Sequence, residues 1–206
     1  MRAADLRKNQ VARTSLSGAE VWISRTGYTG EDGFEVVSPA EVIVEIWGRI
    51  FEAGLPYGLK PAGLGARDTL RTEVCYPLYG HELDDHTTPI EAGLGFFVSW
   101  DKGDFTGRPI LAHQKAKGTT KRLVAFKMTD RSAPPRPHYP IWSSGPQAAL
   151  LGEVASGTQS PSLGIGIGMG YVPTALAKVS TPLEIEIRGR RAPAVVVSKP
   201  IYRKAD

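Results

Sequence analysis

Residues 63–96 read GLGARDTLRTEVCYPLYGHELDDHTTPIEAGLGF. A helix-forming run at 64–73 leads into a loop rich in Tyr, Pro and Gly, then into an acidic, histidine-containing patch and a second run that starts at Thr88. Turn formers and potential ligand contacts are seldom mixed so densely in one stretch. We therefore predict that these residues belong to a binding site and that the rest of the chain is organised around them.

A β-hairpin is predicted ahead of this stretch. Residues 21–24 and 34–37 are apolar and β-rich, and RTGYTGEDG at 25–33 separates them. Three glycines and the Glu-Asp-Gly end favour a tight connection between two strands. Alternation places Glu35 on the face opposite Phe34 and Val36.

A helix is predicted to follow the hairpin. Residues 38–41 read SPAE, which is a capping-box pattern with proline at the first helical position. Gly54 is a natural stop. Apolar residues at helical spacing predict a face that packs into the core: Ile43, Ile46, Trp47 and Ile50.

The second part of the chain has a different pattern. After a possible strand at 96–99 and a short helix at 109–117, six β-rich runs alternate with turns, at 123–128, 139–142, 150–155, 165–172, 183–188 and 193–198. Such regular short strands predict a small antiparallel barrel or sandwich. We predict an α+β protein: a ferredoxin-like-type α+β portion over residues 1–118, incomplete at its N-terminal side, followed by a small antiparallel β-barrel domain over 119–206.

Composition narrows the function. The chain has 206 residues and a formal charge of +4; its basic residues are dispersed, which disfavours a nucleic-acid surface. A single cysteine, Cys75, forms no intrachain disulfide and indicates a reducing compartment. No apolar run reaches the roughly 18–20 residues of a membrane span. We expect no nucleic-acid or membrane partner, and a cytoplasmic protein, or one of the mitochondrial matrix if the source is eukaryotic.

For several motifs, the sequence context disfavours the function that the motif would suggest. GIGIGMG at 164–170 is followed by Tyr171, Val172 and Pro173 rather than by a helix, so it predicts a strand with glycine on one face against a ring or another backbone. The four histidines and one cysteine lack zinc-site spacing, so no metal is expected. Cys75 is expected to be a buried thiol rather than a nucleophile.

Two groups remain as ligand candidates. A carboxylate on a strand, such as Glu35, offers two acceptors side by side, which complement a guanidinium or a 2-amino-4-oxo-pyrimidine edge. A solvated edge-strand carboxylate is the alternative. Arg67 and Arg71 lie one helical turn apart and form either a cationic clamp or ion pairs with Asp68 and Glu73.

The chain resembles the T-protein of the glycine cleavage system, an aminomethyltransferase that uses tetrahydrofolate. The matching pieces are SRTGYTGEDGFE at 24–35, the stretch 63–95, DFTGR at 104–108 and GEVASGTQSPSLG at 152–164. They follow the family order, and the resemblance runs from about Ala19 to Tyr202.

This resemblance implies that tetrahydrofolate binds here and that a lipoylated H-protein delivers an aminomethyl group, with release of ammonia. It assigns the pterin edge to Glu35 and a folate contact to Arg67. Tyr28 would line the same pocket, and Phe96 stands where the family often has tryptophan.

The resemblance also implies a departure from the family. Family members are nearly twice this length, and the half that precedes residue 1 carries the aspartate thought to activate the folate nitrogen. We therefore expect no catalytic residue here and little activity from this half alone. The alternative is a non-catalytic folate-binding module or a paralogue of the iron–sulfur-assembly type.

Overall fold

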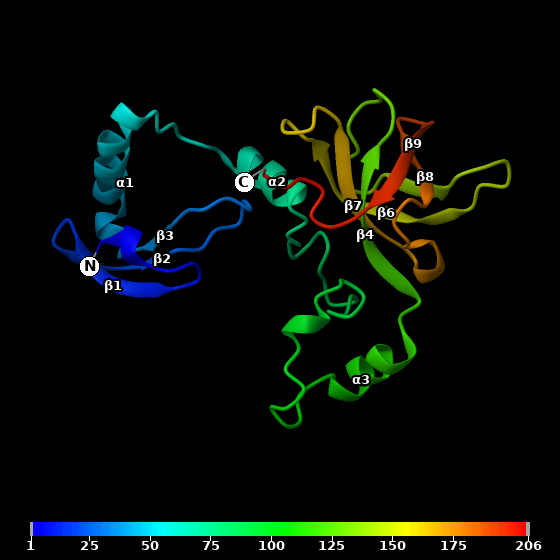
Figure 1. Ribbon diagram of the computed structural model, residues 1–206, viewed down its shortest axis with the longest axis horizontal. Coiled ribbons are helices and arrows are strands. Elements are labelled where there is room, and N and C mark those ends of the chain that lie inside the picture. Colours follow the sequence, from blue (N-terminus) through cyan, green and yellow to red (C-terminus); the bar gives the residue numbers. More distant parts are fainter. Residues whose placement is uncertain (1, 205–206) are drawn as a thin grey trace. The chain divides into compact units, whose positions relative to one another are not determined.

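The structure is a computed structural model that describes residues 2–204. The chain divides into two compact units, one up to Asp68 and one from Thr69 onward. Figure 1 labels their elements. The domain boundary predicted between residues 118 and 119 lies inside the second unit. The division into domains at that position stays a prediction.

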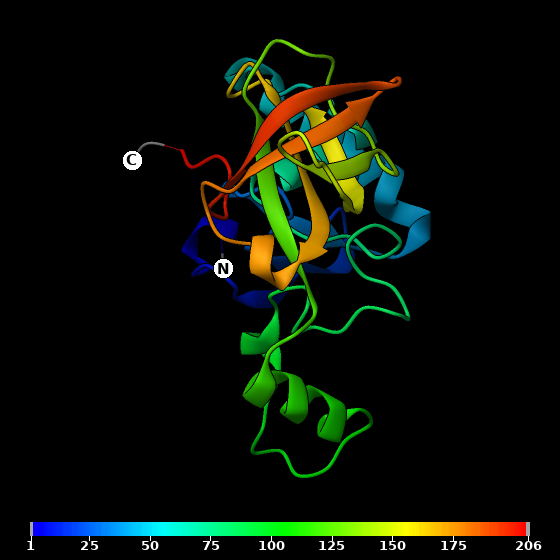
Figure 2. The ribbon, with the colours of Figure 1, turned by 90° about the vertical axis from the view of Figure 1, so that its right-hand side faces the viewer.

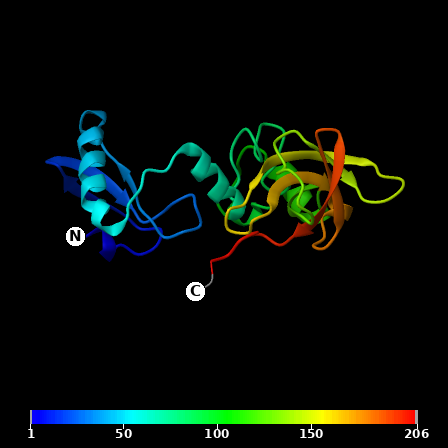
Figure 3. The ribbon, with the colours of Figure 1, turned by 90° about the horizontal axis from the view of Figure 1, so that it is seen from above.

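The first unit is a three-stranded antiparallel sheet with one helix. It contains β1 (Val11–Leu16), β2 (Ala19–Ser24), β3 (Glu35–Val37) and α1 (Ala40–Gly54), with short 3₁₀ turns at Ala3–Asp5 and Leu55–Tyr57. The strand order is β1-β2-β3. Figure 3 shows α1 alongside the strands, and a small core joins them: Leu6, Val21, Ile23 and Ile46.

The predicted hairpin is confirmed. β2 and β3 pair antiparallel, with Ser24 opposite Glu35 and Trp22 opposite Val37. Val36 packs against the core, whereas Glu35 is exposed. The sheet therefore has one face against α1 and one open face that carries Glu35, because side chains alternate along a strand.

The start of α1 differs from the predicted capping box. Pro39, with φ −55° and ψ 144°, is the N-cap residue, and no side chain caps the helix. The Ser38 hydroxyl instead donates to the carbonyl of Pro39. The helix begins one residue later than SPAE suggests, which leaves Ser38 too far back to reach the free N–H groups of the first turn.

The predicted core face of α1 is largely wrong. Ile46 is buried at 2% exposure, but Trp47 is 60% and Ile50 47% exposed, and Ile43 is exposed as well. A sheet of three strands is narrow, so it covers one line of helix side chains and leaves the rest of the apolar stripe in solvent.

The second unit is dominated by a closed six-stranded antiparallel barrel, as predicted (Figure 2). Its strands, in barrel order, are β4 (Lys121–Met128), β7 (Gly166–Pro173), β6 (Leu150–Gln159), β5 (Pro140–Ser143), β8 (Pro182–Ile187) and β9 (Arg190–Val197). A 3₁₀ turn, Thr174–Leu176, follows β7. Side chains such as Phe126, Ile141 and Ile185 fill the interior.

The segment before the barrel is less regular. α2 (Leu64–Glu73) contains the boundary between the units, and α3 (Arg108–Lys117) precedes β4; both helices match the predicted runs. The strand predicted at 96–99 is wrong, since Gly95–Phe97 form a 3₁₀ turn. No named strand pairs with these residues, and Phe96 and Phe97 are both about three-quarters exposed (76% and 75%).

The glycine-rich run is a barrel strand, as predicted. β7 pairs with β4 and β6, and a Cβ atom at Gly168 would lie 2.6 Å from Cζ of Phe126 and 2.7 Å from the carbonyl oxygen of Ser156. Real Cβ atoms do not approach backbone atoms so closely. Glycine is required here because a ring and a neighbouring strand occupy the space.

We expect Gly168→Ala to lower the free energy of unfolding by about 1–3 kcal/mol, because the added methyl forces Phe126 and β6 to move. Chemical denaturation followed by circular dichroism measures the change. Gly48→Ala is the control, since nothing lies within 4 Å of its added Cβ and it sits inside α1. Equal stability of the two variants would contradict the packing argument.

Candidate folate-binding site

The loop between β2 and β3 is held to the start of the chain by Arg25. Its Nε and Nη2 donate to Asp32 at 2.9 and 2.7 Å, and its Nη1 donates to the carbonyl of Leu6 at 2.9 Å. The hydrogen-bonded Arg25 guanidinium holds the pKa of Asp32 below its usual value. A bidentate pair of this kind fixes geometry as well as charge, so both ends of the loop are anchored.

Glu35 lies where this loop enters β3. Its side chain is exposed on the open face of the sheet, and its carboxylate accepts a hydrogen bond from the hydroxyl of Thr26. Thr26 in turn lies 3.0 Å from the hydroxyl of Ser24, the strand partner of Glu35. The carboxylate is thus carried by a paired strand and oriented by a neighbouring hydroxyl while it faces solvent.

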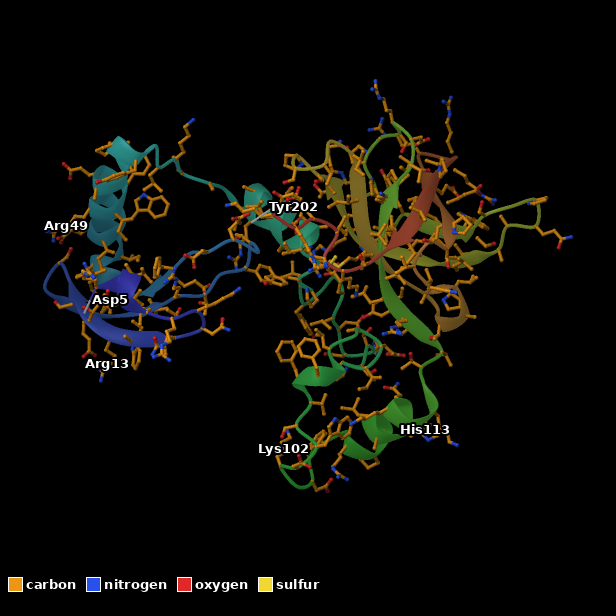
Figure 4. The ribbon with its side chains drawn as sticks, in the orientation of Figure 1. Asp5, Arg13, Arg49, Lys102, His113 and Tyr202 are labelled. Carbon is orange, nitrogen blue, oxygen red and sulfur yellow. The ribbon has the colours of Figure 1, made fainter. Side chains whose placement is uncertain are left out.

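The same open face carries a cross-strand row. Arg13 lies opposite Trp22, which lies opposite Val37. The guanidinium of Arg13 is 5.0 Å from the Trp22 ring centre, and Arg13 projects from β1 on the side away from α1 (Figure 4). Glu35 and Val37 are two residues apart on one strand, so they share this face.

The structure brings Tyr28 and Arg67 together. The Arg67 guanidinium lies 4.8 Å from the centre of the Tyr28 ring, and Tyr28 is half-buried in the β2–β3 loop. A cation above a ring is held by the ring quadrupole, which leaves the N–H donors in the guanidinium plane. Within residues 2–204, no ion pair or hydrogen bond engages the Arg67 side chain, so these donors can serve a ligand.

Phe96, the fourth predicted contact, belongs to the second unit. Its ring centre lies 4.1 Å from that of Phe97, and both rings are exposed. The pair offers an aromatic surface, and the role of Phe96 toward folate stays a prediction.

Arg71 is structural, and the ion pair predicted between it and Glu73 is wrong. It is fully buried and pairs with Glu82, with Nη1 to Oε2 at 2.9 Å, while Nη2 donates to Ser156 at 2.6 Å. Glu73 instead accepts from the hydroxyls of Ser160 and Ser162 at 2.5 and 2.9 Å. Reasoning from the sequence missed Glu82 and Ser156, because no local spacing links them to the helix.

Loop residues after α2 bond mainly to one another. The Tyr79 hydroxyl donates to Asp85 at 2.8 Å, and Asp84 accepts from the backbone N–H of His86 at 2.8 Å. No group of three His, Cys, Asp or Glu side chains suited to a metal ion occurs within residues 2–204. This loop is therefore not assigned a ligand.

Cys75 behaves as a buried thiol. Burial raises the pKa of its thiol to about 11. Because thiolate is the reactive form, iodoacetamide should label the native protein roughly a hundredfold more slowly at pH 8 than it labels the protein in denaturant. The chain has one cysteine, so the labelling rate reports this site alone; equal rates would contradict the shift.

The same shift predicts an alkaline effect on stability. The pKa is higher in the folded state than in the unfolded state, so the stabilisation is complete below about pH 9 and is lost as the pH rises toward 11. Cys75→Ala should reduce that alkaline loss when unfolding is followed as a function of pH.

No helix within residues 2–204 is long and apolar enough to cross a membrane.

Comparison with known proteins places these features in one family. The family described as GCVT N-terminal domain matches residues 1–102, and the glycine cleavage T-protein C-terminal barrel domain matches 121–203. An aminomethyltransferase from Nostoc sp. is 50% identical over 193 residues, which is 93% of this chain and 49% of the relative. One from Rippkaea orientalis is 51% identical over 183 residues, 88% of this chain and 47% of the relative.

A solved structure supports the same family. The crystal structure of glycine cleavage system aminomethyltransferase T from Bartonella henselae matches with a TM-score of 0.80 and 31% identity, over 88% of this chain and 50% of that one. The chain spans about half the length of the curated relatives it matches. The chain therefore belongs to the glycine cleavage T-protein family of aminomethyltransferases, and it corresponds to the half that contains the C-terminal barrel.

Proposed function

We propose that these residues supply folate contacts of a tetrahydrofolate-dependent aminomethyltransferase. In this reaction the aminomethyl carbon leaves the sulfur of a lipoyl arm on H-protein and bonds to a folate nitrogen. Ammonia departs and 5,10-methylenetetrahydrofolate remains. The observation that carries the proposal is the exposed Glu35 carboxylate, held on a paired strand beside Thr26.

The pterin end of tetrahydrofolate fits this carboxylate. Its 2-amino-4-oxo-pyrimidine ring presents an N–H beside an amino group, and the two oxygens of Glu35 can accept from both. The pairing is charge-assisted, which strengthens each hydrogen bond. Glu35 would therefore select the pteridine ring by its donor pattern.

Arg67 and Tyr28 complete the proposed contacts in the first unit. The Tyr28 ring contacts one face of the Arg67 guanidinium. The N–H donors in the guanidinium plane are therefore oriented to bind a carbonyl or carboxylate oxygen of the ligand. Phe96 would add an aromatic surface for a ring of the ligand.

Turnover needs more than these contacts. Transfer to folate requires a group that activates the attacking nitrogen, and we propose that none of the four site residues supplies it. We propose that the 206 residues alone bind folate but transfer the aminomethyl group slowly. An assay with lipoylated H-protein and tetrahydrofolate measures formation of methylenetetrahydrofolate.

This assay separates the proposal from its alternative. Turnover that rises when the N-terminal half of a relative is added supports the transferase. Full turnover by the 206 residues alone would contradict the expected slow reaction. Folate binding without turnover in either arm would favour a non-catalytic folate-binding module.

Arg67→Ala tests the binding contacts. We expect tetrahydrofolate affinity to fall by about 1.5–3 kcal/mol, the range for a hydrogen bond to a charged group. Isothermal calorimetry measures the affinity, and Arg7→Ala, an exposed arginine of the same unit, is the control. A variant that melts earlier but binds folate normally would make Arg67 structural.

A further inference from the structure

The barrel carries a cavity that the proposed folate contacts do not use. It has a volume of about 550 Å³ and lies between the β8–β9 hairpin and the loop after β4. Its walls include Asp130, Ser132 and three arginines of the hairpin, Arg188, Arg190 and Arg191. All of these residues belong to the second unit.

The hairpin turn gathers the positive charge. Ile187 pairs with Arg190, so Arg188 and Gly189 form a two-residue turn, with φ values of 52° and 76°. Positive φ at both central residues is typical of the type I′ turn that matches the strand twist. Arg188 therefore lies in the turn and Arg190 follows it directly, at one end of the barrel sheet.

Two of the three arginines have side chains without an ion-pair or hydrogen-bond partner among the described residues. Arg191 lies 4.0 Å from the Trp142 ring centre, and its Nη1 is 3.9 Å from Oε2 of Glu184. By contrast, no ion pair or hydrogen bond engages the side chain of Arg188 or Arg190 anywhere in the described part of the chain. Asp130, the one carboxylate in the wall, accepts the backbone N–H of Ser132 at 3.1 Å.

A buried hydroxyl in the same wall also lacks a partner. The Oγ atom of Ser132 is inaccessible to solvent and has no hydrogen-bond partner among residues 2–204. A buried polar atom without a partner is unfavourable and calls for an explanation. An acceptor seated in the cavity would satisfy this hydroxyl as well as the arginines.

We propose that this cavity binds a multiply charged oxyanion, of the phosphate or polycarboxylate class, through Arg188, Arg190 and the Ser132 hydroxyl. Guanidinium groups match such ligands because their N–H donors form a planar fork. The walls carry three guanidiniums against one carboxylate, so the local charge favours an anion. Ile187, Ala133 and Ala192 supply the apolar remainder of the lining.

The test is a calorimetric titration of the 206-residue protein with pyrophosphate and, separately, with citrate, at matched ionic strength. We expect saturable binding, weakened at least about tenfold in Arg188→Asn/Arg190→Gln, the loss expected for a charged hydrogen bond. Asparagine tolerates the positive φ of residue 188. Ser132→Ala should weaken binding by a smaller factor, and the stronger ligand of the two identifies the class.

Arg136→Gln is the matched control, an exposed arginine of the barrel unit outside the cavity wall. Equal weakening in this control would show general charge attraction and overturn the site. So would absence of saturable binding with both anions. Tetrahydrofolate affinity should be unchanged in the double variant, so failure here is distinguishable from failure of the folate proposal.

Discussion

Replacing Arg71 by alanine should lower the free energy of unfolding of the second unit by about 3–5 kcal/mol. Arg71 and Glu82 are both fully buried and lie 2.9 Å apart. Removing the guanidinium leaves the Glu82 carboxylate without its cation, in a place that water does not reach. An uncompensated buried charge is among the most destabilising changes a single substitution can make.

The effect should be larger than for an ordinary hydrogen bond because Glu82 is only partly satisfied in the native protein. Its Oε2 accepts from Arg71 and from the backbone N–H of Leu78 at 3.0 Å, whereas its buried Oε1 has no partner in residues 2–204. The arginine therefore supplies most of the compensation. Denaturant unfolding followed by circular dichroism measures the loss.

Two further variants test the cause. Arg136→Ala removes an exposed arginine of the same unit and should change stability by less than about 0.5 kcal/mol. Arg71→Met combined with Glu82→Leu removes both charges and should recover much of the loss, since apolar residues can replace a buried pair. If the double variant is as unstable as Arg71→Ala, the unpaired charge is not the cause.

The second large effect is expected on ligand binding. Glu35→Ala should weaken tetrahydrofolate binding about a hundredfold, because the substitution removes the two proposed charge-assisted hydrogen bonds to the pterin edge, at about 1.5 kcal/mol or more each. Glu35 is exposed and faces away from the core, so stability should change little. Calorimetric titration and thermal melting of the same samples separate the two effects.

A conservative substitution of Glu35 and a substitution at another exposed carboxylate serve as controls for this test. Glu35→Gln exchanges one acceptor for a donor and should also bind weakly, because an amide cannot accept from both the ring N–H and the amino group. Glu41→Ala removes an exposed carboxylate at the start of α1 and should bind normally. Unchanged affinity in Glu35→Ala would refute the pterin-edge role.

Local pattern in the sequence was sufficient for most of the secondary structure, with β1 as one strand that it did not predict. Six β-rich runs became the six barrel strands, and the run 64–73 became α2, because period and turn residues act within a few positions. Glycine on one face of β7 was predicted for the same reason. Where local signals were ambiguous the prediction failed, as at 96–99, where apolar residues form a 3₁₀ turn with no strand beside them.

The site was predictable only in part. Strand alternation and helical spacing indicated Glu35 and Arg67, the family resemblance added Tyr28, and alternation placed Glu35 on the open face. The stacking of Arg67 on Tyr28 joins residues 39 positions apart (67 minus 28), which no periodicity reveals. The cavity arginines lie close together in the sequence, but the unpartnered hydroxyl of Ser132 is seen only in the tertiary structure.

Sequence alone therefore determined most of the strands and helices, though not β1, as well as the hairpin that carries Glu35 and the family to which the chain belongs. The tertiary structure decided that Arg71 pairs with Glu82 and Ser156, the latter 85 residues away, and that most of the apolar stripe of α1 faces solvent. Strand and helix periods are local properties of the chain. Ion-pair partners and burial depend on which distant segments pack together, and that is settled only when the whole unit folds.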